Sequence, residues 1–258
     1  MNEAPPPQAD KSSFRISHFL SRAGVASRRK AEDIVRKGRV RLNGNLVEDL
    51  ATQVIPGADE VTVDDKQIHL SGETLVLAMN KPKGIVVTRH DPQHRRTVYD
   101  LLPKEFSRQA GALAYAGRLD ASTTGLLILS TDGDLLNRLM HPRYGVRKTY
   151  HCSVDAPLSE EDLKSLRGGI ALEEFQAAPC EVRELTRGGA KSFQYELALH
   201  EGKNREVRRM MRALGKRINW LRRVAVGGLD VRRLRLREGE VRALGPEEVA
   251  ALCGPAKP

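Results

Sequence analysis

The chain has 258 residues, of which 40% are hydrophobic and 29% charged, enough apolar residues to bury a core. Its 43 lysines and arginines outnumber 33 aspartates and glutamates, and the net charge of +10 favours a polyanionic partner such as RNA, DNA or acidic lipid. The three scattered cysteines suggest neither a disulfide framework nor a zinc site, and no run reaches the roughly 18 apolar residues of a membrane span. We therefore predict a cytoplasmic protein.

The first elements along the chain are predicted to form a small folded unit at residues 14–68, after a disordered tail at 1–13. Ile16, Phe19 and Leu20 share one helical face, and Ser27 begins a second helix by capping it. The alternating run "RVRLNGNLV" then predicts a β-hairpin that turns at "NG". Two short helices followed by a small sheet are the expected structure.

Positive charge gathers in the helical half of this unit. Residues 14–41 hold nine basic and two acidic side chains, whereas a merely solvated helix face would carry more balanced charges. The stretch "RISHFLSRAGVASRRKAEDIVRKGRVRLNG" also resembles the S-four-type RNA-binding domain, whose basic helices and hairpin dock on structured RNA. The residues expected to bind RNA are Arg15, Arg22, Arg28, Arg29, Lys30, Arg36, Lys37 and Arg39.

A polar linker is predicted at residues 69–75, and a larger domain at 76–253 is followed by a tail at 254–258. Short apolar runs such as "LVLAM", "GIVVT", "GLLILS" and "FQYELAL" alternate there with helical stretches such as "SEEDLKSLRGG" and "NREVRRMMRALG". The fold class expected is α+β: a small N-terminal α/β domain, then a mixed, largely antiparallel sheet flanked by helices.

Asp120 is an unusual charge within this larger domain. It lies in "AGRLDASTTGLLILSTDG", just before a predicted buried strand at 125–130 and a helix at 134–140 capped by Thr131 or Asp132. A lone aspartate in a loop is most often a turn or capping residue. A metal site nearby is not expected, because Pro92 disfavours a helix through the only close histidine pair, in "HDPQH".

A second basic segment follows at residues 202–237, with thirteen basic and two acidic side chains. Six motifs in the chain, in order, are "NKPKGIVVT", "TVYDLLP", "AGRLDASTTGLLILSTDG", "LMHPRYGVRKTY", "EGKNREVRRMMRALG" and "LREGEVRAL". They resemble the bacterial ribosomal RNA pseudouridine synthases of the RsuA/RluB type. With the first unit, the resemblance covers nearly the whole chain; one departure is Glu206, where many relatives have Gln.

The resemblance implies an isomerase with the pseudouridine synthase fold that converts a uridine to pseudouridine without a cofactor or metal. It makes Asp120 the essential carboxylate, acting on the sugar as a nucleophile or as a base that forms a glycal. Arg208 is expected to pair with Asp120 through two-pronged hydrogen bonds, with Arg205 as the alternative partner. Tyr150, otherwise an ordinary half-buried strand residue, is expected to stack on the flipped-out base. The remaining residues expected to hold substrate are Arg118, Arg205, Lys203 and Asn204.

Three functions remain open from the residues themselves. The first is rRNA modification during ribosome biogenesis, with 23S rRNA favoured and 16S rRNA possible. The second is a non-catalytic RNA-binding protein. The third is an RNA glycosidase or nuclease, which normally needs a second carboxylate or a metal. We expect a monomer whose partner is ribosomal RNA.

Overall fold

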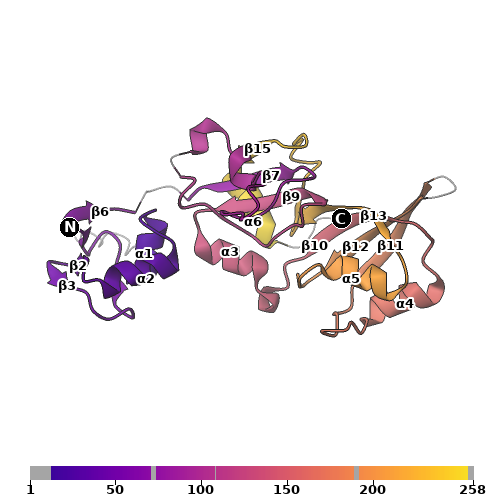
Figure 1. The fold of residues 1–258 in the computed structure, drawn as a ribbon, viewed down its shortest axis with the longest axis horizontal. Coiled ribbons are helices and arrows are strands. Elements are labelled where there is room, and N and C mark those ends of the chain that lie inside the picture. Colours follow the sequence, from indigo (N-terminus) through magenta and orange to yellow (C-terminus); the bar gives the residue numbers. More distant parts are fainter. Residues whose placement is uncertain (1–12, 71–73, 108, 189–191, 255–258) are drawn as a thin grey trace, which may run out of the picture. The chain divides into compact units, whose positions relative to one another are not determined.

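The structure, a computed structural model, describes residues 13–70, 74–107, 109–188 and 192–254. These residues form two compact units (Figure 1). The first unit holds the described chain up to Thr74 with a short stretch that ends at Ala112, and the second holds 75–107 and the chain from Leu113 onward. Both predicted tails, apart from one residue of each, and the centre of the predicted linker lie outside the described residues.

The first unit combines two helices with a four-stranded sheet, ordered β3-β2-β5-β6, and a two-stranded ribbon, β1-β4. Its elements are α1 (Ile16–Arg22), α2 (Arg28–Arg36), β1 (Phe14–Arg15), β2 (Val40–Leu42), β3 (Asn45–Leu46), β4 (Gln53–Val54), β5 (Val61–Val63) and β6 (Lys66–Ile68). Ile16, Phe19 and Leu20 are buried in its core, as predicted. The small α/β unit expected from the sequence is therefore present.

Local sequence signals explain the ends of these elements. The Ser27 side chain accepts a hydrogen bond from the Lys30 backbone N–H and so caps α2, as predicted. Asn43 and Gly44 both have positive φ angles, 51° and 82°, which suit the tight turn between β2 and β3. The turn therefore forms where the "NG" pair predicted it.

The second unit is built on a nine-stranded sheet among the described residues. Its strands are β7 (Val76–Lys81), β8 (Ala114–Tyr115), β9 (Thr123–Ser130), β10 (Lys148–Val154), β11 (Glu181–Gly188), β12 (Ser192–Leu199), β13 (Ile218–Val226), β14 (Leu229–Asp230) and β15 (Val241–Ala243). Its helices are α3 (Gly133–Met140), α4 (Glu160–Gly168), α5 (Glu206–Ala213) and α6 (Pro246–Cys253). Short 3₁₀ turns are η1 (Val98–Leu101), η2 (Lys104–Phe106) and η3 (Pro142–Tyr144).

The main strand order is β11-β12-β10-β13-β9-β7-β15, with β14 on β13 and β8 on β9. Among the described strand pairs of this sheet only β9–β13 is parallel, so the sheet is mixed and largely antiparallel, as predicted. Gly125 lies in this parallel pair opposite Arg223, with φ 105°. A Cβ atom at Gly125 would lie 2.1 Å from the Arg223 carbonyl oxygen, so the close approach of β9 and β13 requires glycine there.

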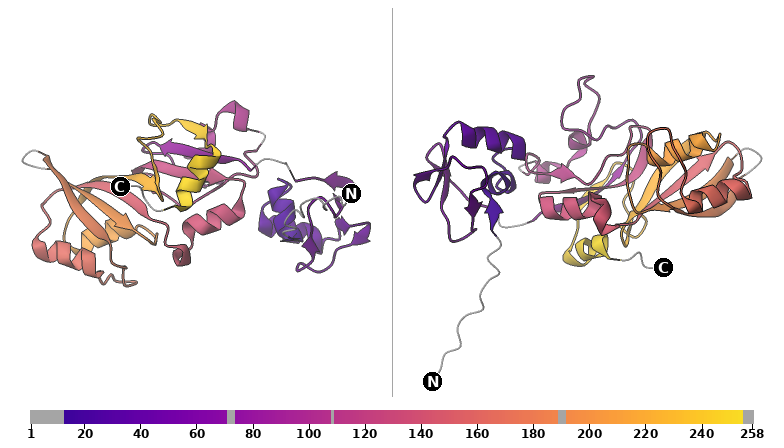
Figure 2. Two further views of the ribbon diagram at one scale, coloured as in Figure 1. Left: turned by 180° about the vertical axis from the view of Figure 1, so that it is seen from behind. Right: turned by 90° about the horizontal axis from the view of Figure 1, so that it is seen from below.

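The strands β10 to β13 have two different faces. One face packs against α4 and α5 through an apolar cluster that includes Cys152, Tyr195, Leu221 and Met210. Both helices can be followed on this side of the strands in Figures 1 and 2. Because side chains alternate along a strand, the residues between these point to the opposite face.

One apolar run does not form the strand that its composition favours. In "GIVVT", the described backbone makes only an isolated bridge between Val86 and Thr97. Gly84 turns the chain with φ 86°, and its N–H binds the Ala121 carbonyl instead of a strand neighbour. The run packs as a loop, with Ile85 and Val87 buried in the cluster beside β7 and β9.

Candidate active site

A small pocket lies between the loop from β8 to β9, strand β10 and the start of α5. Its volume is about 170 Å³, below the roughly 300 Å³ at which pockets for drug-sized ligands begin. A space of this size suits a single ring system. The predicted site residues that line it are Arg118, Asp120, Tyr150, Lys203, Arg205 and Arg208.

The backbone around Asp120 is held from both sides. Leu119 is buried in the core beside β9, and the Asp120 carbonyl accepts a 3.0 Å hydrogen bond from the Thr123 N–H. The Gly84 N–H binds the next carbonyl, that of Ala121, at 2.7 Å. With its position fixed, the Asp120 side chain remains 27% exposed and faces the pocket.

The buried Lys81 supports the Gly84 loop. Its Nζ donates to the carbonyls of Pro82 and Ile85 at 2.8 and 2.7 Å. Burial lowers the pKa of Lys81 to about 8, and the carboxylates of Asp120 and Glu238 oppose that shift. Lys81 therefore stabilises the loop that binds the chain next to Asp120.

Two arginines from one helix end meet the Asp120 carboxylate. Arg208 Nε lies 3.3 Å and Arg205 Nη1 lies 3.5 Å from the same Oδ2 atom. Arg208 lies in the first turn of α5, whereas Arg205 immediately precedes the helix. The second arm of Arg208 binds the Thr123 hydroxyl at 3.2 Å, so the two-pronged contact with Asp120 expected from the sequence is wrong.

The start of α5 has an unusual backbone. Arg205 precedes the first residue of the helix and adopts a left-handed conformation, φ 52° and ψ 29°. Non-glycine residues adopt this conformation at a cost that the surrounding structure must offset. Here the conformation brings the Arg205 guanidinium, 52% exposed, to the carboxylate that Arg208 reaches from the next turn.

Three buried charged residues that line the pocket were not predicted as site residues: Lys148, 7% exposed, and Arg223 and Glu206, each 4% exposed. Lys148 lies two residues before Tyr150 on β10, so the alternation of the strand could have revealed it. Burial and the nearby charge of Arg223 lower the pKa of Lys148 to about 8, and the Glu206 carboxylate opposes the shift. These residues make the pocket floor strongly polar.

Glu206 occupies the first position of α5. Its Oε2 accepts a 3.0 Å hydrogen bond from the Lys203 N–H, whereas Oε1 is buried without a donor among the described residues. Burial and the neighbouring Glu201 carboxylate raise the pKa of Glu206 well above its usual range. A proton on Glu206 lets it donate to Glu201, as a glutamine amide would do at this position.

We expect Glu206→Gln to stabilise the protein by on the order of 2 kcal/mol near pH 8. The folded chain binds a proton at Glu206 that the unfolded chain releases above about pH 4.5, so wild-type stability falls as pH rises. The advantage of the variant should vanish near pH 4. Urea unfolding at both pH values checks this, with the exposed Glu105→Gln as control. Equal stability of wild type and variant at pH 8 would contradict it.

The other predicted substrate-binding residues differ in placement. Arg118 is exposed at the rim of the pocket. Lys203 lines the pocket, but its Nζ binds the Gln176 carbonyl at 2.9 Å and the Glu201 carboxylate. Asn204 does not line it; its Oδ1 accepts a 3.3 Å hydrogen bond from Arg209. Arg118 is therefore placed to contact substrate, whereas Asn204 contacts Arg209 of α5 and does not face the pocket.

In the first unit, seven of the eight predicted RNA-binding residues are exposed. Arg22 is half-buried over the Phe14 ring. Arg36 pairs with Glu32 and Asp33, and Arg39 pairs with Asp64. Three further cations stand at the start of α2 and make no ion pair among the described residues: Arg28, Arg29 and Lys30.

The part of the chain that the structure describes holds neither a candidate metal site nor a membrane-spanning helix. No three histidine, cysteine or acidic side chains gather there as metal ligands would. No described helix has the length and apolar character needed to cross a membrane.

Each of the two units matches a known protein family. Residues 75–213 match the RNA pseudouridylate synthase family, and residues 14–59 match the S4 domain. The fold and these matches define a pseudouridine-forming enzyme that carries an RNA-binding module. The chain belongs to the RNA pseudouridylate synthase family.

The similarity to individual proteins extends over nearly the full length of this chain. "Ribosomal large subunit pseudouridine synthase B" of Bacillus subtilis is 36% identical over 92% of this chain and 95% of its own. An "Uncharacterized RNA pseudouridine synthase" of Aquifex aeolicus is 37% identical over 92% of this chain and 93% of its own. A crystal structure of a pseudouridylate synthase superposes with a TM-score of 0.65 at 29% identity, covering 93% of this chain and 99% of that one.

Proposed function

We propose that this enzyme converts one specific uridine of 23S rRNA to pseudouridine, with Asp120 as the catalytic carboxylate. The observation that carries the assignment is the Asp120 carboxylate, with Arg208 and Arg205 at 3.3 and 3.5 Å, inside a pocket that suits one base. The large-subunit target is supported by the similarity to the Bacillus subtilis enzyme. Such a substrate places the reaction in the cytoplasm, where ribosomes assemble.

The reaction exchanges one bond of the nucleoside for another. The N1–C1′ bond breaks, the uracil turns, and a C5–C1′ bond forms; the proton leaves C5, and N1 ends protonated. Asp120 acts on the sugar, by attack at C1′ or by removal of the 2′ proton to give a glycal. Both routes use the carboxylate, and its Oδ2 lies within 3.5 Å of two guanidiniums.

The pocket reaches the uridine only after the base leaves its stack, which costs a few kcal/mol. Tyr150 lines the pocket on β10 and is proposed to stack on the turned base and to assist proton removal from C5. Arg118 at the rim is proposed to brace the extruded nucleotide by binding a phosphate or filling the vacated place.

The rRNA target is tested by incubating the purified protein with 23S and 16S rRNA transcripts and mapping pseudouridine in each. We expect one modified position, in 23S rRNA, and none in 16S rRNA. Modification of 16S rRNA alone would overturn the 23S assignment but keep the chemistry. Bound but unmodified RNA would favour the non-catalytic alternative.

Arg208→Ala should lower the single-turnover rate by about 10²-fold, because one of two counter-charges of Asp120 is lost in a partly desolvated site. Arg208→Lys keeps the charge and should recover part of the rate. The deficit should persist with saturating enzyme, and adding Arg205→Ala should deepen it. A deficit that disappears at saturation would show that Arg208 only binds RNA.

The basic start of α2 should supply RNA affinity and not chemistry. Replacing Arg28, Arg29 and Lys30 by Ala should weaken rRNA binding. The slope of the logarithm of the binding constant against the logarithm of salt concentration should become shallower by about two to three, because that many fewer counterions are released. The single-turnover rate at saturation should not change. Filter binding across a salt series measures this, and an unchanged slope would show that these cations face away from RNA.

A further inference from the structure

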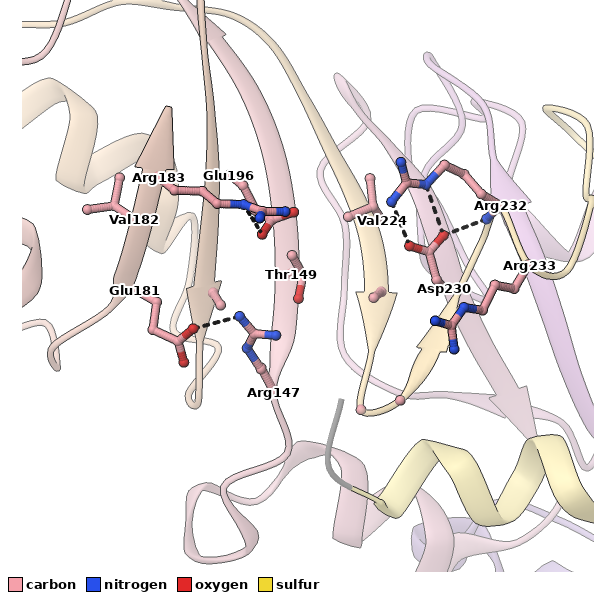
Figure 3. Close-up of a pocket in the computed structure, with 14 residues that line it drawn as sticks. Arg147, Thr149, Glu181, Val182, Arg183, Glu196, Val224, Asp230, Arg232 and Arg233 are labelled. Carbon is pink, nitrogen blue, oxygen red and sulfur yellow. Dashed lines mark hydrogen bonds and ion pairs between the residues drawn. The ribbon is translucent and has the colours of Figure 1, made fainter. Parts of the chain in front are cut away.

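A second hollow lies on the opposite face of the strands that carry Tyr150. It has a volume of about 670 Å³ and is lined from β10, β11, β12 and β13, and from the segment that follows β14. Thr149 lines it while its neighbour Tyr150 lines the Asp120 pocket, as strand alternation requires. Figure 3 shows Glu181, Arg147, Arg183 and Glu196 along one side and Asp230, Arg232 and Arg233 along the other. We call this hollow the rear groove.

Three ion pairs organise the rear groove. Arg147 binds Glu181 at 2.7 Å, Arg183 binds Glu196 at 3.0 Å, and Arg232 binds Asp230 at 3.0 Å. The Arg183 and Arg232 side chains are each 70% exposed despite these pairs. Each carboxylate orients its arginine, and the outer N–H groups of the exposed guanidiniums stay open to a ligand.

The groove and its surroundings also hold positive charge that no carboxylate balances. Arg233 lines the groove and makes no ion pair within the described residues. Arg222 lies on the same face of β13, opposite His151 of β10, and also makes no ion pair there. The three paired arginines are neutralised, so these two give the face its excess of positive charge.

An aromatic side chain extends the same face. Trp220, the only tryptophan of the chain, lies two residues from Arg222 on β13 and is 39% exposed. Trp220 lies opposite Ser153 of β10, and strand alternation turns Ser153 to the face opposite that of Tyr150. A flat exposed ring in line with arginines is the combination with which proteins bind single-stranded nucleic acid.

We propose that the rear groove and Trp220 bind a single-stranded segment of the rRNA substrate, remote from the uridine in the Asp120 pocket. Arg222 and Arg233 contact phosphates, the ordered carboxylates accept hydrogen bonds from base amino groups or 2′-hydroxyls, and Trp220 stacks on a base. This combination of ion-paired carboxylates and unpaired arginines suits RNA, because RNA has hydrogen-bond donors on its base edges and sugars and negative charge on its backbone. The inference rests on the proposed RNA substrate.

The test uses the full-length protein and a 23S rRNA transcript. The double variant Arg233→Glu/Trp220→Ala should raise the Kd for the transcript roughly 10-fold, the size expected from the loss of one phosphate contact and one stacked base. Arg237→Glu is the matched charge control, since Arg237 is 89% exposed and lies outside the groove. Arg233→Lys should retain nearly wild-type affinity.

A crosslinking experiment locates the contact directly. A transcript that contains 4-thiouridine should crosslink to peptides with Trp220 or Arg232 and Arg233. The proposal is overturned if no such peptide appears, or if the double variant loses no more affinity than Arg237→Glu. A lower single-turnover rate at saturating enzyme would also contradict a pure binding role. Both binding readouts are independent of pseudouridine formation, so a failure of the proposed activity would be recognised separately.

Discussion

Asp120→Asn should abolish pseudouridine formation, lowering the single-turnover rate at least about 10⁴-fold, while rRNA binding remains. Asparagine keeps the size of the side chain and the turn, in which the backbone carbonyl of residue 120 binds the Thr123 N–H. It removes the carboxylate that either proposed route requires. Arg205 and Arg208 would then face an uncharged amide, and Arg208 would keep its contact with the Thr123 hydroxyl.

The matched control is Asp134→Asn in the exposed first turn of α3, fourteen residues along the same chain segment. It should leave the rate unchanged. Rapid mixing of saturating enzyme with rRNA, followed by nucleoside analysis, gives the rate, and filter binding gives the affinity. Substantial turnover by Asp120→Asn would remove this residue from the chemistry.

Gly125→Ala should have the largest effect on stability, about 4 kcal/mol or more. A methyl group there would meet the Arg223 carbonyl oxygen at 2.1 Å and the Arg223 N and C atoms at 2.9 Å. These are backbone atoms of the parallel β9–β13 pair, so neither strand can move without breaking the ladder beside Asp120. The φ of 105° adds strain for any residue with a Cβ.

Gly239→Ala separates the steric clash of the added methyl group from the backbone strain of a positive φ. Gly239 has φ 88°, but a Cβ there meets nothing within 4 Å, so only the backbone strain of roughly 1 kcal/mol should appear. Urea unfolding of both variants measures the difference. If both lose the same stability, steric conflict between β9 and Arg223 does not account for the glycine.

Local signals predicted the elements whose ends are set by neighbouring residues. Ser27 and the "NG" turn act over a few residues, so the helix cap and the hairpin could be read directly. The buried strand β9 and the amphipathic helix α5 likewise follow from continuous periodic patterns. The mixed sheet was expected as a class, but its strand order depends on pairings between distant segments.

The parts of the candidate site that could not be predicted depend on distant contacts. Whether Arg208 uses both arms on Asp120 depends on the Thr123 hydroxyl, 85 residues away in sequence. Arg223 reaches the pocket only because β13 pairs with β9. Glu206 was visible as a departure from related sequences, but its buried position and its pairing with Glu201 needed the folded chain.

The most direct test of the central claim follows the hydrogen at C5. The enzyme is incubated with 23S rRNA that carries tritium at C5 of its uridines, and both released tritium and RNA mass are measured. The account predicts release of one tritium per rRNA by the wild type, no change in the mass of unlabelled RNA, and no release by Asp120→Asn. Retention of the tritium, or loss of a uracil base from the RNA, would contradict it.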